Sequence, residues 1–406
     1  MQETLWDHRY AQRTQRMSGS AIREILKLTE QPDIISFGGG LPSPDVFPLE
    51  RIRLACDRIL SEQAAYVLQY GTTEGYLPLR EMLAGFAARH GINVTAENVL
   101  MTSGSQQALD LLGKIFINPG DRILVETPTY LGALQAWNAY GAEYVSVHSD
   151  EQGIDPDSLE KELRCGAKLL YVIPNFQNPT GMTIPFERRK RIIELADQFG
   201  VPIIEDDPYG QLRFEGDPIT PILAMDSKAR NSGTAYYRGN VIYLSTFSKI
   251  MAPGIRLAWV IAPPEVIRKL VMAKQGADLN TSTLNQALAY EVGRDGFIDQ
   301  HVNLIRKVYK NRRDVMLDAL TEFMPEGVRW THPLGGLFLW TILPEKIDTA
   351  NLLKKAIQRK VAFVPGASFH PNGGGHNTMR LNFSYSNQEK IIEGISRLGG
   401  VVKESL

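Results

Sequence analysis

Between Asn98 and Ala262 the chain alternates short apolar runs with longer segments in which apolar residues recur at helical spacing. The apolar runs predict buried strands at Val99–Thr102, Ile123–Glu126, Tyr144–Val147, Leu169–Ile173, Val201–Glu205, Val241–Leu244 and Trp259–Ala262. Helices are expected between them at 106–117, 130–140, 157–163 and 186–199. Such alternation predicts a mainly parallel sheet with helices on both faces, which binds ligands at the carboxyl ends of its strands.

The pattern changes after a helical stretch at about 265–320. Short strands are expected at 328–330, 336–341, 362–364 and 378–383, with helices between and after them. We therefore predict three parts: an N-terminal arm at 1–45, a large α/β domain at 46–310 and a small α+β domain at 311–406. Apolar positions 22, 25 and 26 predict one short amphipathic helix in the arm, Ser20–Leu28.

Composition and charge are those of an ordinary globular protein. The chain has 406 residues, 43% hydrophobic and 22% charged, and its formal net charge of −1 favours neither nucleic acid nor an anionic membrane as a partner. No apolar run approaches membrane-spanning length, and the start of the chain lacks the apolar stretch of a secretory signal. The two cysteines, Cys56 and Cys165, form no CxxC motif. We interpret both as packing residues and expect a reducing, cytoplasmic location.

One stretch between two predicted strands combines a lysine, an arginine and small hydroxyl residues, in the order Ser245, Thr246, Ser248, Lys249 and Arg256. A lysine at this place can form a Schiff base with an aldehyde. Hydroxyls and a guanidinium suit a phosphate dianion, so the stretch suits pyridoxal phosphate. A solvated surface loop is the alternative for this stretch alone. A Ser-x-x-Lys acyl-enzyme motif is excluded, because position 246 is threonine.

Two further strand ends carry residues that suit such a cofactor. Ser103–Gln107 opens a helix whose free backbone N–H groups attract an anion, or it is an ordinary helix cap. Asn178 lies in Asn175–Gly181, where its amide can donate to a phenolate oxygen; a Pro-Gly turn is the alternative. The triple glycine Gly38–Gly40 is not followed by Gly-Lys-Ser/Thr, and no GxGxxG exists, so nucleotide binding is disfavoured.

A third strand end carries three acids, Glu205, Asp206 and Asp207, followed by Tyr209. A buried carboxylate needs a partner, and the pyridine nitrogen of pyridoxal phosphate is one. Such a pair keeps the nitrogen protonated and makes the ring an electron sink. A metal site and a solvated turn are the alternatives. No histidine lies nearby, so we predict no metal.

An aromatic residue and an arginine complete the candidate site. Tyr130 lies at a strand end, where it can stack on a ring. Arg380 lies on a predicted strand of the second domain, and an inward arginine there suits a carboxylate or a structural ion pair.

Taken in order, these pieces resemble the fold-type-I pyridoxal-phosphate aminotransferases of class I/II. The resemblance covers nearly the whole chain and is carried by Ser103–Gln106, Tyr130, Asn178–Gly181, Asp206 with Tyr209, Ser245–Lys249, Arg256 and Arg380. More narrowly, the chain resembles the branch of 2-aminoadipate and kynurenine aminotransferases, close to the 2-aminoadipate enzymes of lysine biosynthesis. The supporting stretches are Ile34–Pro42, Leu68–Tyr76, Lys274–Asp278 and Val361–Gly366.

The resemblance implies a fold and an assembly. The large domain at 46–310 is expected to bind pyridoxal phosphate on a mainly parallel seven-stranded sheet between helices, beside the small α+β domain. The arm at 1–45 is expected to cover the active site and to pack with the small domain. A homodimer with shared active sites is implied, because Tyr70 is expected to reach the cofactor phosphate of the neighbouring subunit.

The resemblance also implies roles around the cofactor. Lys249 forms the Schiff base and, once released, is the general base that moves the proton from Cα to C4′. Asp206 pairs with the ring nitrogen, Asn178 and Tyr209 hold O3′, and Tyr130 stacks on the ring. The residues expected to hold the phosphate are Ser105, Gln106, Thr246, Ser248 and Arg256.

On the substrate side, the resemblance implies that Arg380 grips the α-carboxylate with help from Asn178. Arg23 and Gly40 are expected over the substrate side chain. Arg23 can reach a second carboxylate, as in 2-aminoadipate or glutamate, and can swing out to admit leucine. A solvated arginine is the alternative.

We therefore predict an aminotransferase that moves an amino group from 2-aminoadipate, glutamate, leucine or an aromatic amino acid to a 2-oxo acid such as 2-oxoglutarate. A lyase or synthase on the same cofactor is one alternative, because the cofactor carries the chemistry. A non-catalytic regulator domain that binds pyridoxal phosphate is the other. It is disfavoured, since only about 30 residues precede the glycine-rich loop, too few for a winged helix.

Overall fold

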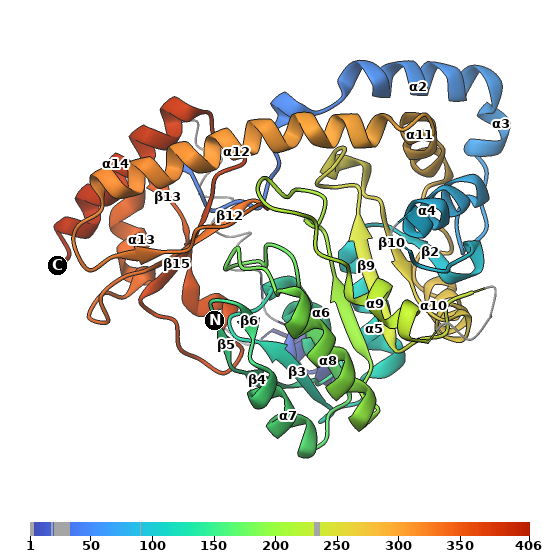
Figure 1. Cartoon of the computed structure of the whole chain (residues 1–406), viewed down its shortest axis with the longest axis horizontal. Coiled ribbons are helices and arrows are strands. Elements are labelled where there is room, and N and C mark those ends of the chain that lie inside the picture. Colours follow the sequence, from blue (N-terminus) through green and yellow to red (C-terminus); the bar gives the residue numbers. More distant parts are fainter. Residues whose placement is uncertain (1–3, 18, 20–32, 90, 231–235) are drawn as a thin grey trace.

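The computed structural model describes residues 4–17, 19, 33–89, 91–230 and 236–406, which are built around two sheets (Figure 1). The larger sheet has seven strands. In spatial order they are β2 (Val99–Thr102), β10 (Ala258–Ile261), β9 (Val241–Thr246), β8 (Ile203–Asp206), β7 (Leu169–Val172), β3 (Arg122–Glu126) and β4 (Glu143–Val147). The seven-stranded sheet predicted from the sequence is confirmed, and strand ends differ from the predicted ones by at most two residues.

Strand β10 is the one antiparallel member of this sheet. It pairs antiparallel with β9 on one side and with β2 on the other, whereas the other neighbours pair parallel. The connection from β9 to β10 is short, 247–257, and holds no crossover helix, so the chain returns in the opposite direction. The lysine–arginine stretch is this return loop, and it therefore lies at the carboxyl end of β9.

Helices cover both faces of the sheet. One core cluster joins the strands to α5 (Ser105–Phe116), α6 (Leu131–Asn138) and α10 (Pro264–Gln275). The other joins them to α4 (Leu77–Arg89), α7 (Pro156–Arg164), α8 (Phe186–Phe199), α9 (Ile222–Ala229) and α11 (Thr283–Gly293). Strands such as β2 and β7 are buried at every position, which explains why they read as continuous apolar runs without alternation.

The smaller sheet has four antiparallel strands in the order β11 (Arg329–Trp330), β12 (Phe338–Ile342), β15 (Thr378–Asn382) and β14 (Val364–Pro365). It is accompanied by α13 (Thr349–Gln358) and α14 (Gln388–Lys403). Helix α12 (Phe297–Phe323) runs from α11 to the small sheet and packs on α14 (Figure 1). The predicted division at 310 falls inside this continuous helix, and the division into domains stays a prediction.

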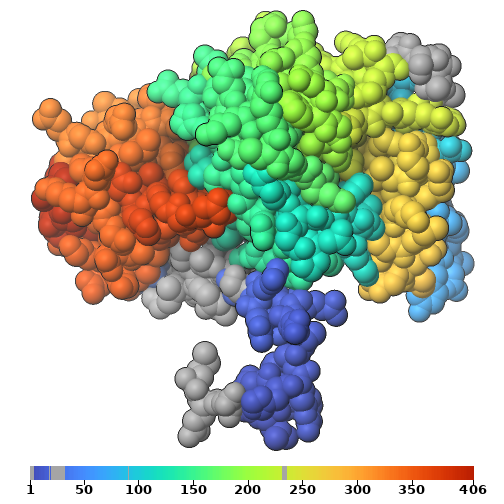
Figure 2. All heavy atoms as spheres, turned by 90° about the horizontal axis from the view of Figure 1, so that it is seen from below, coloured from blue at the N-terminus to red at the C-terminus, as the bar shows by residue number. Residues whose placement is uncertain are grey.

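The N-terminal segment packs against the small-sheet region. Strand β1 (Ile35–Ser36) pairs parallel with β13 (Val361–Ala362). Residues 4–17, which include the short 3-10 helix Gln12–Arg16, project from the body in Figure 2, with Arg16 next to Gly141 and with Leu5, Trp6 and Tyr10 exposed. The predicted helix Ser20–Leu28 lies outside the described residues.

Several short elements have no strong pattern in the sequence and were not predicted. They are the hairpin of β5 (Ser149–Asp150) with β6 (Gly153–Ile154), and α3 (Ala64–Val67), which follows α2 (Leu49–Glu62). The prediction that both cysteines are packing residues is wrong for Cys165, which is exposed because it lies at the end of α7. In the part of the chain that the structure describes, no helix is long and apolar enough to cross a membrane.

Candidate active site

A cavity of about 310 Å³ lies at the carboxyl edge of the large sheet, where it meets the small sheet. Strands β2, β3, β7, β8 and β9 end at this edge, and β10 begins there. The predicted residues that line the cavity are Gly40, Ser105, Gln106, Tyr130, Asn178, Asp206, Tyr209, Thr246, Ser248, Lys249, Arg256 and Arg380. The structure thus brings together residues that are up to 340 positions apart, from Gly40 to Arg380.

Lys249 places a primary amine at the centre of this cavity. It follows β9 in the return loop, and its Nζ donates a hydrogen bond to the backbone oxygen of Gly40 at 2.8 Å. Burial, followed by the positive charges of Arg380 and Arg256, lowers the pKa of Lys249 to about 8. At neutral pH a useful fraction of this amine is therefore uncharged and nucleophilic.

The three acids at the end of β8 have different surroundings. Glu205 accepts hydrogen bonds from the backbone N–H groups of Ile222 and Leu223 at 2.8 and 2.7 Å, at the start of α9. Asp207 accepts hydrogen bonds from Asn175 and Tyr243 at 2.9 and 3.1 Å. Successive strand residues point to opposite faces, so Glu205 and Asp207 share one face.

Asp206 points to the other face and lines the cavity. Its Oδ2 accepts a hydrogen bond from the Tyr171 hydroxyl at 2.8 Å, and its buried Oδ1 has no hydrogen-bond partner among the described residues. Burial raises the pKa of Asp206 to about 7, the Tyr171 hydrogen bond lowers it, and the charge of Asp207 raises it. A buried carboxylate with one oxygen left over suits a cationic ring nitrogen.

A group of residues at the start of α5 can bind an anion; we call Gly104, Ser105, Thr246, Ser248 and Arg256 the anion cradle. Ser105 is the first residue of the helix, and its buried Oγ has no partner in the described residues. Gly104 precedes it with φ 91°, and a Cβ built there would lie 2.5 Å from a guanidinium nitrogen of Arg256. Glycine at 104 therefore lets the cation approach the helix N-terminus closely, and both attract an anion.

Two hydroxyls from the return loop complete this cradle. Thr246 Oγ1 donates to the backbone oxygen of Leu257 and lies 3.0 Å from Ser248 Oγ. Both residues are buried and line the cavity. Gln106 is turned aside, since its Nε2 donates to the backbone oxygen of Gly132 at 2.8 Å.

Arg380 is a buried cation that pairs with no carboxylate of the described residues. Its Nη1 donates to Asn178 Oδ1 at 2.8 Å and its Nη2 to the backbone oxygen of Gly38 at 2.7 Å, whereas Nε is buried and has no partner within the described residues. No salt bridge joins it to any acid of the described chain. The structural ion pair, which was the alternative for Arg380, is therefore not found there. Burial lowers the pKa of Arg380 to about 10, so it stays protonated at neutral pH.

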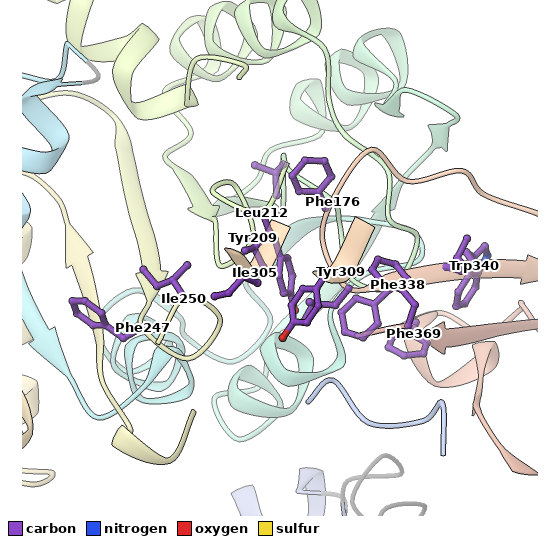
Figure 3. Close-up of a cluster of buried hydrophobic side chains, with 14 of the residues drawn as sticks. Phe176, Tyr209, Leu212, Phe247, Ile250, Ile305, Tyr309, Phe338, Trp340 and Phe369 are labelled. Atoms are coloured by element: carbon purple, nitrogen blue, oxygen red, sulfur yellow. The ribbon is translucent and has the colours of Figure 1, made fainter. Parts of the chain in front are cut away.

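Aromatic side chains form the walls between Lys249 and Arg380. The Arg380 guanidinium carbon lies 4.3 Å from the ring centre of Phe338, and Tyr209 meets Phe338 edge to face at 5.9 Å. Figure 3 shows Tyr209 and Phe338 side by side where the two sheets meet. Tyr130 lies at the start of α6, against Gly132, where a Cβ would lie 2.5 Å from the Tyr130 ring.

Pyridoxal phosphate fits this set of groups. The cavity holds an amine of lowered pKa for an aldehyde, a buried carboxylate oxygen without a partner for a ring nitrogen, and a helix N-terminus with a hydroxyl and a guanidinium for a phosphate. Over the described residues no group of three or more His, Cys, Asp or Glu side chains could hold a metal ion.

Two predicted site residues are not brought into the cavity. Tyr70 lies in the loop after α3 with 79% of its surface exposed, and it does not line the cavity of its own chain. Arg23 lies outside the described residues.

The sequence did not single out four residues that take part in the site, namely Tyr171, Ile173, Pro208 and Phe338. Phe338 was inside a predicted strand, and its pairing with Asn382, two positions from Arg380 on β15, could not be known before the register of β12 and β15. Tyr171 lies in an apolar run that gives no sign of which face it occupies.

Comparison with known proteins gives a consistent result. Residues 32–398 match the family model described as aminotransferase class I and II. The chain is 49% identical over 397 residues to aromatic-amino-acid aminotransferase 1 of Thermococcus litoralis, covering 96% of this chain and 93% of that protein. It is 44% identical over 404 residues to the 2-aminoadipate transaminase of Thermus thermophilus, covering 99% and 98%.

Among solved structures, the chain resembles alpha-aminoadipate aminotransferase from Thermus thermophilus, which is complexed with N-(5'-phosphopyridoxyl)-L-leucine. The TM-score is 0.92 at 41% identity, and 99% of each chain is covered.

Proposed function

The chain belongs to the aminotransferase class I and II family and is a pyridoxal-phosphate-dependent transaminase, and we propose the residues and the substrates through which it acts. The observation that carries the proposal is that Lys249 and Arg380 line the same cavity. An amine, and a buried guanidinium that no acid of the described residues pairs with, match the amino and carboxylate ends of an α-amino acid.

We assign the holding of the cofactor to the following groups. The free oxygen of Asp206 pairs with the ring nitrogen, and Asn178 and Tyr209 hold the phenolate oxygen. Tyr130 covers the ring. The phosphate is held by the side chains of Ser105, Thr246, Ser248 and Arg256 and by the backbone N–H of Gln106 in the first turn of α5. When bound, pyridoxal phosphate supplies a ring that withdraws electrons from the substrate's α-carbon and carries the amino group between substrates.

The proton transfer belongs to Lys249 in this account. Its Nζ anchors the cofactor's aldehyde and, when free, accepts the proton from the substrate's α-carbon. The lowered pKa of about 8 supports this role, because a base must be partly neutral at the working pH. The Gly40 carbonyl, at 2.8 Å, orients the amine.

Arg380 binds the substrate α-carboxylate through a two-pronged ion pair. Its contacts with Asn178 and Gly38 fix the plane of the guanidinium, and the Phe338 ring shields one side from water. A guanidinium held in this way is preorganised, so little side-chain entropy is lost when the carboxylate arrives.

We propose 2-aminoadipate, glutamate, leucine and aromatic amino acids as donors and 2-oxoglutarate as the acceptor. The aromatic and 2-aminoadipate activities in the names of the relatives support this range. The apolar Phe338 and Ile173 in the cavity wall suit apolar side chains. Gly40 leaves room above the site, since a Cβ there would lie 3.2 Å from Phe338.

Arg23 is proposed as the residue that accepts a second carboxylate. Arg23→Ala is then expected to lower kcat/KM for 2-aminoadipate and glutamate by about 10- to 100-fold, the value of one charge-assisted hydrogen bond, and to leave leucine nearly unchanged. An equal loss for acidic and apolar donors would assign Arg23 a structural role.

We further propose a homodimer with shared sites, located in the cytoplasm. Tyr70 and its neighbours Tyr66 and Leu68 are exposed on α3 and the loop after it, which supports an interface at this place. The near-neutral charge and the two unpaired cysteines support a reducing compartment.

The proposal is tested by a panel of single L-amino acids, each with 2-oxoglutarate, in which glutamate formation is measured for the reconstituted enzyme. We expect turnover with 2-aminoadipate and with leucine or an aromatic donor. Turnover confined to donors outside this range, or an acceptor other than 2-oxoglutarate, would contradict the substrate assignment.

A further inference from the structure

The hydroxyl of Tyr171 donates a hydrogen bond to Oδ2 of Asp206 at 2.8 Å, deep beneath the cavity. The two side chains have 0% and 2% of their surface exposed. Tyr171 lies on β7 opposite Ile204 of β8, and side chains two residues apart on a strand share a face. Tyr171 and Asp206 therefore project to the same side of the sheet, and the length of the tyrosine spans the offset between them.

Packing fixes the position of the Tyr171 ring. It meets Trp137 edge to face, with 5.3 Å between ring centres and 88° between planes. Trp137 is itself fully buried and donates its Nε1–H to the backbone oxygen of Leu109 at 2.8 Å. The hydroxyl that reaches Asp206 thus belongs to a ring that has little freedom to move, as a positioning group requires.

This hydrogen bond leaves Asp206 with one defined free oxygen. Oδ2 is occupied by Tyr171, and Oδ1 is buried without a partner in the described parts of the chain. If the carboxylate rotated, Tyr171 would lose its acceptor, so the hydroxyl also sets the orientation of Oδ1. The neighbouring Asp207 has both oxygens occupied, by Asn175 and Tyr243.

The Tyr171 hydroxyl opposes the effects that raise the pKa of Asp206. Burial raises the pKa of Asp206 to about 7 and the charge of Asp207 adds to this, whereas the Tyr171 hydrogen bond lowers it. Burial raises the pKa of Tyr171 well above its usual value, so it remains a donor. The other ionisable side chains around the pair are Tyr130, Tyr209 and Glu126. Burial raises the pKa of Tyr209 and Glu126 too, and neither supplies a positive charge.

We propose that Tyr171 is a positioning residue that keeps Asp206 ionised, with Oδ1 free to pair with the ring nitrogen of pyridoxal phosphate, and thereby sets how fully that nitrogen is protonated. The inference rests on the proposed role of Asp206. Only one proton is concerned, and it lies either on the ring nitrogen or on the Asp206 carboxyl. Without the hydroxyl the carboxylate is more basic, and the proton moves from the nitrogen towards Asp206.

The test uses the holoenzyme reconstituted with pyridoxal phosphate labelled with ¹⁵N in the ring. In Tyr171→Phe, the ¹⁵N resonance is expected to move towards the position of an unprotonated pyridine. The pH midpoint of the cofactor's visible absorbance is expected to rise by up to about one unit, because a charge-assisted hydrogen bond changes a carboxyl pKa by about one to two units. We expect kcat to fall about tenfold. Little change in KM is expected, because Tyr171 does not contact Arg380, the residue assigned to binding of the substrate carboxylate.

Tyr243→Phe is the matched control. Its hydroxyl donates to the adjacent acid, Asp207, at 3.1 Å, so the same substitution removes the same kind of bond from the carboxylate that faces away from the cavity. In the Tyr243→Phe enzyme, the ¹⁵N resonance of the cofactor ring and the pH midpoint of the visible absorbance are expected to match those of the wild type. Incorporation of 3,5-difluorotyrosine at 171 keeps the ring and strengthens the donor, so both signals are expected to move the opposite way. This substitution decides the matter if Tyr171→Phe does not fold.

The outcomes separate the inference from its premise. If Asp206→Asn moves the ¹⁵N resonance and both Tyr171 substitutions leave it in place, the role of Tyr171 is overturned and that of Asp206 stands. If Asp206→Asn leaves the resonance unchanged, the role of Asp206 and this inference fall together.

Discussion

The guanidinium of Arg380 donates a hydrogen bond to Oδ1 of Asn178 at 2.8 Å, and this contact joins the two sheets at the cavity. Arg380 lies in the middle of β15 of the small sheet, whereas Asn178 follows β7 of the large sheet. Asn178 and Tyr209 line the same cavity, and both are assigned to the cofactor's phenolate oxygen. One asparagine therefore connects the group assigned to the substrate carboxylate with the cofactor, so substrate and cofactor are positioned relative to each other.

Arg380→Met is expected to lower kcat/KM for every amino-acid donor by about 100-fold or more. A methionine fills a similar volume but removes both charge-assisted hydrogen bonds to the carboxylate. The measurement is steady-state kinetics with an acidic and an apolar donor, together with the cofactor content of the purified variant. Arg359→Met is the control, because Arg359 forms an exposed ion pair with Glu404 and is expected to have no effect. If Arg380→Met kept the wild-type kcat/KM, Arg380 would not be the residue that binds the substrate carboxylate.

Gly104→Ala is expected to weaken binding of pyridoxal phosphate by about tenfold or more. The new methyl would lie 2.5 Å from a guanidinium nitrogen of Arg256 and would push this cation from the helix N-terminus. The control is Gly120→Ala, which has a similar φ of 88° with no atom within 4 Å of the new Cβ. Both variants carry backbone strain, so a loss of stability is expected in both. Equal cofactor affinity in the two variants would contradict the cradle at Gly104.

The rate at which apoenzyme binds pyridoxal phosphate covalently is expected to rise with pH around a midpoint near 8. The neutral amine is the reactive form, and burial with the charges of Arg380 and Arg256 lowers the pKa of Lys249 from 10.5 to about 8. The neutral fraction therefore grows as pH rises through about 8. The measurement is the rate of appearance of visible absorbance between about pH 6 and 10. Arg380→Met is expected to move the midpoint upwards; a wild-type midpoint near the ordinary lysine value would disprove the shift.

The order of elements in the large domain could be predicted because every strand except the edge strand β4 is buried along most of its length and the helices have an apolar face. The direction of β10 could not, since an apolar run does not show its direction and only the length of the connection decides it. The two-residue strands β5 and β6 are too short to give a periodic pattern.

The residue types of the site were predictable because they follow predicted strands, and the ends of parallel strands meet at one edge. The partners of Asp206 were not. Because side chains alternate between the two faces of a strand, Asp206 must point to the face opposite Glu205 and Asp207. The alternation does not show which of the two faces carries the cavity. Tyr171 and Phe338 enter the site through the registers of β7 with β8 and of β12 with β15, which depend on tertiary structure.

Mixing two defective variants tests whether the sites are shared. Tyr70→Ala is expected to be impaired because it loses a contact with the partner's cofactor, and Lys249→Ala because it loses the amine. A heterodimer of the two has one site without either change. A mixture co-refolded in equal amounts is expected to reach about a quarter of wild-type activity, well above the mean of the two parents. Activity equal to that mean would place Tyr70 outside the site of the partner.

The most direct test of the central claim is a single half-reaction. The purified protein is loaded with pyridoxal phosphate and given L-2-aminoadipate or L-leucine without an acceptor. The account predicts loss of the visible absorbance with one equivalent of 2-oxo acid formed per chain, followed by recovery when 2-oxoglutarate is added. Lys249→Ala is expected to show no turnover. Release of ammonia would contradict the account. So would a visible absorbance that neither L-2-aminoadipate, nor L-leucine, nor any other L-amino acid of the panel proposed above changes.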